Sequence, residues 1–131
     1  MLNYEISGAG KEKLVLLHGF MENLMIWEEM ETHLSEDLTL IKIDLPGHGL
    51  SKIYREIHTM EFMAEEVKKL TDHLKLENFH LLGHSMGGYV SLAFAEKFPE
   101  TLKSLTLFFS TYFADDEEKK EQRRKSHRII Q

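Results

Sequence analysis

The chain has 131 residues, of which 42% are hydrophobic and 29% charged, and its formal net charge is -6. This length and composition are typical of one globular domain with a buried core, while the acidic balance disfavours nucleic acids and anionic membrane surfaces as partners. The absence of cysteine excludes disulfides and a thiol nucleophile. The start of the chain resembles no signal peptide, and no apolar run is long enough to span a membrane, so the expected location is the cytoplasm.

Short apolar runs alternate with helical patterns along most of the chain. In chain order the sequence predicts an edge strand at 4–7, a strand at 13–18, a helix at 23–34, a strand at 38–43, a helix at 59–76, a strand at 79–82, a helix at 86–97 and a strand at 103–110. Apolar strands that alternate with helices indicate an α/β fold, in which a mostly parallel sheet is flanked by helices through right-handed crossovers.

The end of the chain differs in composition from the rest. Most side chains of residues 114–131 are charged or polar, with acidic residues first and basic residues last, an order that complements a helix dipole. Asp116 and Lys120 also have the i,i+4 spacing of a helical ion pair. We therefore expect a domain core at 1–113 and a charged helix at 114–131. This helix is either a solvated chain end or the first helix of a segment that continues beyond Gln131.

Three loops with unusual sequences follow the core strands. They are His18-Gly19-Phe20 after the first core strand, residues 44–51 (Asp-Leu-Pro-Gly-His-Gly-Leu-Ser) after the second, and Gly83-His84-Ser85-Met86-Gly87 after the third. Because the carboxyl ends of parallel strands meet at one edge of the sheet, where ligands bind, the sequence predicts a functional site formed by these loops.

The third loop has the pattern G-x-S-x-G between a predicted strand and a predicted helix, which is the setting of a nucleophile elbow. The turn is tight, and Gly83 and Gly87 remove side chains that would clash there. Ser85 is expected at its apex, with a strained backbone and an exposed hydroxyl. The alternative is an ordinary N-cap serine at the start of the helix, which the flanking glycines disfavour.

In these three motifs, in their order and in their spacing, the chain resembles the α/β-hydrolase superfamily, in its serine hydrolase and esterase-like branch. The resemblance covers nearly all of residues 1 to 113. It implies that Ser85 attacks the carbonyl carbon of an ester, thioester or related small-molecule acyl substrate and forms an acyl-enzyme. It implies further that the backbone N–H groups of Phe20 and Met86 form the oxyanion hole. The resemblance also implies that four residues support the loops rather than take part in catalysis: His18, Gly19, Asp44 and His48.

The resemblance implies no cofactor, and no pair of histidines has convincing metal-ligand spacing. It also implies the chain order serine, acid, histidine, in which the acid and the histidine follow later strands beyond a lid segment. The charged residues 114–131 resemble the start of that lid. Asp115, Asp116 and His127 follow Ser85 in the right order, but on one predicted polar helix. We therefore expect the triad acid and base outside this chain, and a core without its carboxyl-terminal strands.

Two functions of different classes stay open. The first is a serine hydrolase of which this chain is the amino-terminal part. The second is a catalytically weak half-domain that acts as a binding or assembly module, with the edge of the strand at 103–110 available for pairing with another copy. A nucleotide-binding domain is disfavoured, because neither a G-x-G-x-x-G nor a P-loop pattern follows the first core strand.

Overall fold

The computed structural model describes residues 1–110 and 116–122. Its centre is a five-stranded sheet in the order β1-β3-β2-β4-β5. The strands are β1 (Tyr4–Ser7), β2 (Glu12–Leu17), β3 (Leu38–Ile43), β4 (Phe79–His84) and β5 (Leu102–Phe108). Strand β1 runs antiparallel to β3, and the other neighbouring strands are parallel. The expected α/β fold with a mostly parallel sheet is therefore confirmed, with one antiparallel strand at its edge.

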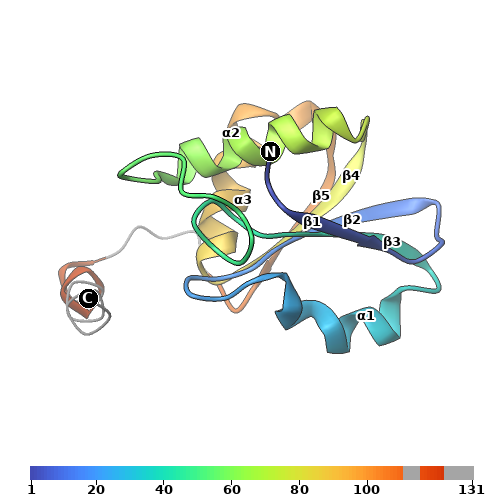
Figure 1. The fold of residues 1–131 in the computed structure, drawn as a ribbon, viewed down its shortest axis with the longest axis horizontal. Coiled ribbons are helices and arrows are strands. Elements are labelled where there is room, and N and C mark those ends of the chain that lie inside the picture. The colour runs from blue at the N-terminus through green and yellow to red at the C-terminus, as the bar shows by residue number, and fades with distance from the viewer. Residues whose placement is uncertain (111–115, 123–131) are drawn as a thin grey trace.

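Helices cover both faces of this sheet, as Figure 1 shows. One face carries α2 (Met60–His73) and α3 (Met86–Lys97); the other carries the 3-10 turn η1 (Leu24–Trp27) and helix α1 (Glu28–Leu34), and a second 3-10 turn, η2 (Pro99–Thr101), precedes β5. The larger core lies under α2 and α3, and a smaller one surrounds Trp27 under α1. Within the described part of the chain, no helix combines the length and apolar character needed to cross a bilayer.

The main differences from the sequence-based expectation lie at the ends of elements. The helix predicted at 23–34 divides into η1 and α1. The helix predicted at 59–76 ends earlier, because Lys75 has a φ of 57°, which is incompatible with a right-handed helix. The strand predicted at 79–82 continues to His84, so β4 leads directly into the elbow.

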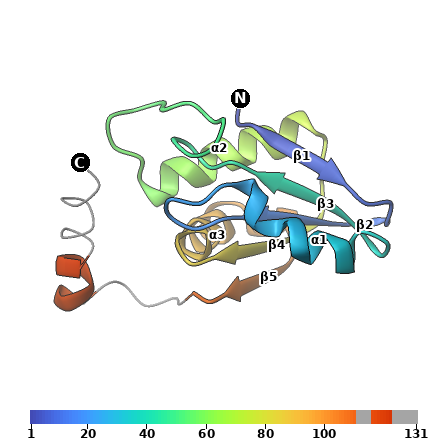
Figure 2. The same ribbon diagram turned by 60° about the horizontal axis from the view of Figure 1, so that its bottom comes forward.

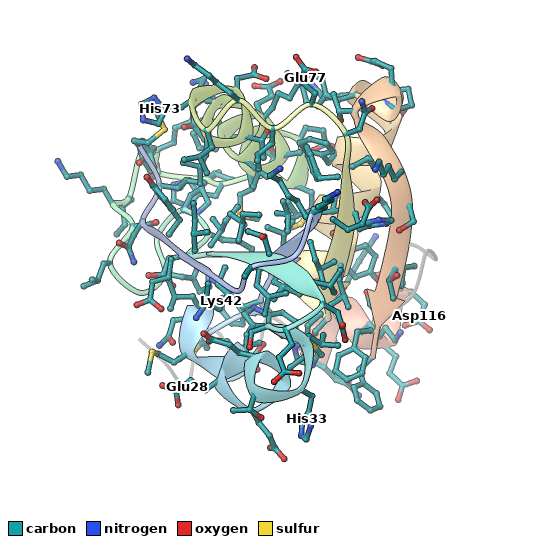
Figure 3. The ribbon with its side chains drawn as sticks, turned by 90° about the vertical axis from the view of Figure 1, so that its right-hand side faces the viewer. Glu28, His33, Lys42, His73, Glu77 and Asp116 are labelled. Carbon is teal, nitrogen blue, oxygen red and sulfur yellow. The ribbon has the colours of Figure 1, made fainter. Side chains whose placement is uncertain are left out.

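A buried cation ties helix α1 to the sheet. The Lys42 ammonium on β3 lies 2.5 Å from Glu31 Oε2 on α1 and 3.2 Å from Glu5 Oε2 on β1, and Figure 3 shows Lys42 between the sheet and α1. Burial alone would lower the pKa of Lys42, but hydrogen bonds to Glu31 and Glu5 outweigh it and hold that pKa above its usual value. The charged lysine therefore fixes the position of α1.

The described part of the charged tail, residues 117–122, is helical and lies apart from the sheet in Figures 1 and 2. Asp116 caps this helix, since its Oδ1 accepts the Lys119 N–H at 2.8 Å. The predicted Asp116–Lys120 ion pair is wrong, because Lys120 Nζ pairs instead with Glu117 Oε1 at 3.4 Å. The rest of the predicted helix lies outside the described residues.

Candidate active site

Ser85 lies at the turn between β4 and α3 with φ 54° and ψ -115°, a conformation that residues with a side chain rarely adopt. This is the strained backbone that the motif predicts. The Ser85 side chain makes no capping hydrogen bond to α3, so the ordinary N-cap alternative is wrong. Strand β5 holds the turn, because the Ser85 N–H donates to Phe108 O at 3.3 Å and Ser85 O accepts the Ser110 hydroxyl at 2.8 Å.

Glycines allow the chain to approach this turn closely. A Cβ on Gly83 would lie 2.2 Å from Gly87 O, which matches the predicted crowding across the turn. A Cβ on Gly87 would instead lie 2.3 Å from Leu17 O at the end of β2, so the neighbouring strand requires this glycine. Gly88 is required by Ser110, whose Oγ would lie 2.0 Å from a Cβ there. No motif singled out Ser110, because it follows its strand with no recognisable pattern.

The loop after β2 lies directly against the elbow. A Cβ on Gly19 would lie 3.1 Å from the Ser85 Cβ. The neighbouring Phe20 N–H makes no hydrogen bond within residues 1–110 and 116–122. Met86 is the first residue of α3, where backbone N–H groups have no acceptor within the helix. Both predicted oxyanion donors thus belong to segments that meet at Ser85, and their action on a ligand stays a prediction.

His18 is fully buried and joins the loops after β2 and β3. Its Nε2 accepts the Leu45 N–H at 2.9 Å, so Nδ1 carries the proton and donates to Gly19 O at 2.7 Å. Burial lowers the pKa of His18, which keeps this neutral tautomer. The His48 ring packs 5.0 Å from the His18 ring and 6.0 Å from the Phe20 ring, measured between centroids. These contacts suit the support of loops rather than proton transfer.

Asp44 connects three segments of the chain. Its Oδ1 accepts the Leu24 N–H at 2.8 Å, and its Oδ2 accepts the Asn3 Nδ2–H at 2.8 Å and the Leu50 N–H at 2.9 Å. The residue is buried, and these bonds engage both carboxylate oxygens. Such contacts suit an anchor of the β3 loop, the role that the resemblance implies.

Glu22, which the sequence motifs did not indicate, contacts both halves of the site. Its Oε1 accepts the Gly19 N–H at 2.7 Å and lies 2.8 Å from His84 Nδ1. The His84 ring packs against Trp27 and Phe108, at centroid distances of 6.3 and 5.8 Å. A carboxylate on the α1 side of the sheet therefore joins the oxyanion loop to the residue before Ser85.

An open groove of about 660 Å³ adjoins this carboxylate. It is lined by Glu22, Ile26, Trp27, Glu29, Met30, His33, Leu34, His84 and Phe108. Strand β5 at its side pairs with β4 alone among the described strands, as Figure 2 shows. Two aromatic side chains near the end of β5 are exposed, Phe108 at 39% and Phe109 at 80%.

The remaining predicted groups are not assembled into a catalytic triad in the described structure. Asp116 is exposed and directly precedes the helix at 117–122, and Asp115 and His127 lie outside the described residues. Within the described ranges, no cluster of three or more histidine, aspartate and glutamate side chains is arranged to hold a metal ion.

Comparison with known proteins places this site in context. The alpha/beta hydrolase fold family matches residues 13–127. A thermophilic esterase from Thermogutta terrifontis superposes with a TM-score of 0.90 at 35% identity, over 98% of this chain and 47% of the esterase.

Two curated relatives match at the sequence level. The dihydrolipoyllysine-residue acetyltransferase component of the acetoin cleaving system of Pseudomonas putida is 40% identical over 79% of this chain and 28% of its own length. The pimeloyl-[acyl-carrier protein] methyl ester esterase of Sodalis glossinidius is 36% identical over 79% of this chain and 38% of its own length. The chain thus spans well under half the length of these relatives.

Proposed function

The chain belongs to the alpha/beta hydrolase fold family, and on this premise we propose that it is the amino-terminal part of a serine hydrolase for an ester, thioester or related carbonyl substrate. The observation that carries the proposal is the positive φ of Ser85, 54°, at the turn between β4 and α3. A strained serine at the carboxyl edge of a parallel sheet is the arrangement in which the hydroxyl acts as a nucleophile. The similarity to two esterases supports the same class of substrate.

In the proposed reaction, Ser85 Oγ attacks the carbonyl carbon and its proton passes to a general base. The leaving group departs from the tetrahedral intermediate, and water later releases the acyl group from Ser85. The Phe20 and Met86 N–H groups would stabilise the oxyanion, and the loss of one such donor typically lowers the rate about 100- to 1,000-fold. The N-terminus of α3 adds positive potential at the same point.

We propose that the general base and its acid come from polypeptide outside these 131 residues. The family order of serine, acid and histidine supports this proposal, as does the coverage of only 47% of the solved esterase. Without a base, the oxyanion hole and substrate binding still accelerate the reaction roughly a thousandfold over water. The chain alone should therefore be a weak catalyst.

Hydrolysis of p-nitrophenyl acetate tests both parts of this proposal. The release that remains without a base does not depend on the serine, so the readout for Ser85 is its acetylation, located by peptide mapping. We expect slow release of nitrophenol and an acetyl adduct on Ser85 of the wild-type chain. The adduct should be absent in Ser85→Ala and kept in Ser104→Ala, a control at an exposed serine of β5. A wild-type chain whose Ser85 is not acetylated would contradict the role of Ser85. Turnover typical of complete esterases, abolished by Ser85→Ala, would contradict the external base.

A binding or assembly module is the second candidate function, and it is favoured by the edge of β5 that no described strand pairs with. Unpaired strand edges present N–H and C=O groups that template pairing with another chain, and Phe109 adds an exposed aromatic side chain beside it. This candidate predicts a dimer in light scattering that Thr106→Pro on β5 dissociates. A wild-type monomer at high concentration would contradict it.

A further inference from the structure

Glu22 contacts the oxyanion loop through both its side chain and its backbone. Its Oε1 accepts the Gly19 N–H at 2.7 Å, and its own N–H donates to Gly19 O at 3.2 Å. The turn from Gly19 to Glu22 is thus closed by two hydrogen bonds. Met21 within it has a φ of 63°, a conformation that strains a residue with a side chain. The two hydrogen bonds help to keep the turn in this strained form.

The same carboxylate also contacts the elbow. Glu22 Oε1 lies 2.8 Å from His84 Nδ1, and His84 directly precedes Ser85. Aromatic neighbours pack against the His84 ring, with centroid distances of 6.3 Å to Trp27 and 5.8 Å to Phe108. The Glu22 carboxylate therefore contacts the His84 ring, which is held in place by packing against Trp27 and Phe108.

These contacts converge on Gly19. A Cβ placed there would lie 2.5 Å from Glu22 Oε1, 3.3 Å from His84 Nδ1 and 3.1 Å from the Ser85 Cβ. Gly19 is the residue directly before Phe20, and the Phe20 N–H is the proposed oxyanion donor of this loop. A shift of the Glu22 carboxylate would therefore move the Phe20 N–H relative to the Ser85 hydroxyl.

We propose that Glu22 is a positioning residue that holds the Phe20 N–H at a fixed position relative to the Ser85 hydroxyl. It does so by hydrogen bonding to the Gly19 N–H on one side and to His84 on the other. This inference rests on the proposed function, since the position of the Phe20 N–H matters only if an oxyanion forms at Ser85. Glu22 acts through the loop and does not touch the substrate. Displacement of a catalytic group by about 1 Å can lower a rate about 100-fold, so the effect of losing Glu22 is measurable.

Three variants separate this role from a general effect on the fold. Glu22→Ala removes the acceptor, whereas Glu22→Gln keeps an oxygen at the same position. Glu29→Ala is the matched control, because Glu29 lines the same groove, is exposed, and loses the same charge on substitution. All variants are compared with wild type at a temperature well below the lowest melting temperature among them.

Two readouts are needed. The first is the rate at which a fluorophosphonate modifies Ser85 with imidazole added as the general base that the chain lacks, measured by intact mass with Ser85→Ala as the blank. We expect Glu22→Ala to react about 10- to 100-fold more slowly than wild type, and Glu22→Gln and Glu29→Ala to stay within about threefold. The second is exchange of the Gly19 amide proton by NMR, which should be at least about tenfold faster in Glu22→Ala alone.

The outcomes distinguish the two proposals. Equal rates for wild type and Glu22→Ala would overturn the positioning role and leave the proposed function standing. A Glu22→Gln variant as slow as Glu22→Ala would overturn the role of the carboxylate oxygen as the acceptor. Absence of an adduct on wild-type Ser85 would overturn the proposed function, and the positioning role with it.

Discussion

The strained backbone at Ser85 predicts that glycine is more stable than alanine at this position. Both Ser85→Gly and Ser85→Ala remove the hydroxyl, so their difference reports the backbone alone. A residue with a side chain at φ 54° costs of order 1–3 kcal/mol, which glycine avoids. Glycine in turn loses about 0.5–1 kcal/mol through the greater freedom of its unfolded chain. The difference lies between about 0 and 2.5 kcal/mol, so Ser85→Gly should unfold with a free energy about 1 kcal/mol above that of Ser85→Ala.

Urea denaturation measures this difference, and the melting temperature should rise by roughly 3–4 °C per kcal/mol for a domain of this size. The matched control is the same pair of substitutions at Ser104, in the middle of β5, where φ is not positive. There the order should reverse, with glycine less stable than alanine. If Ser85→Gly proves no more stable than Ser85→Ala while the control pair behaves as expected, the strain at the elbow is refuted.

Three further predictions concern the surroundings of the elbow. Gly83→Ala should cost about 3 kcal/mol or more in urea denaturation, because the added Cβ would lie 2.2 Å from Gly87 O; a loss under about 1 kcal/mol would contradict the packing. Burial lowers the pKa of His18, so in acid the unfolded chain binds a proton that the folded chain does not. Stability should therefore fall as the pH drops below about 6.5, by at most about 1.4 kcal/mol per pH unit for this group; His18→Gln should show a shallower fall, and an unchanged pH profile would contradict the assignment. Glu31→Gln should destabilise the chain by about 1–3 kcal/mol in the same assay, because it weakens the pairing of the buried Lys42 ammonium; no change would show that Lys42 does not need this partner.

The strands and the elbow were predictable from sequence because their signals are local. Apolar runs of four to six residues identify the core strands, and G-x-S-x-G between a strand and a helix requires a tight turn at Ser85 whatever surrounds it. The Lys75 conformation that ends α2 early was not predictable, because no glycine or asparagine marks it.

Glu22 and Ser110 were missed for a different reason. Both act on groups that are distant in sequence: Glu22 on His84, and Ser110 on Ser85 O. Such contacts depend on which strands are neighbours and on the register of β2, β4 and β5, which no pattern within one segment contains. Even within one segment, spacing did not predict the contact of Asp116. Its spacing to Lys120 fits an ion pair, but its carboxylate instead caps the helix.

The central claim is that Ser85 is a nucleophile, and peptide mapping after treatment with a fluorophosphonate tests it most directly. The chain is incubated with the probe and with imidazole as an added general base, then digested, and each serine-containing peptide is sequenced by mass spectrometry. The account predicts a single adduct on Ser85, with no adduct in Ser85→Ala or in chain unfolded in urea before treatment. An adduct on another serine, or equal modification of the folded and unfolded chain, would contradict it.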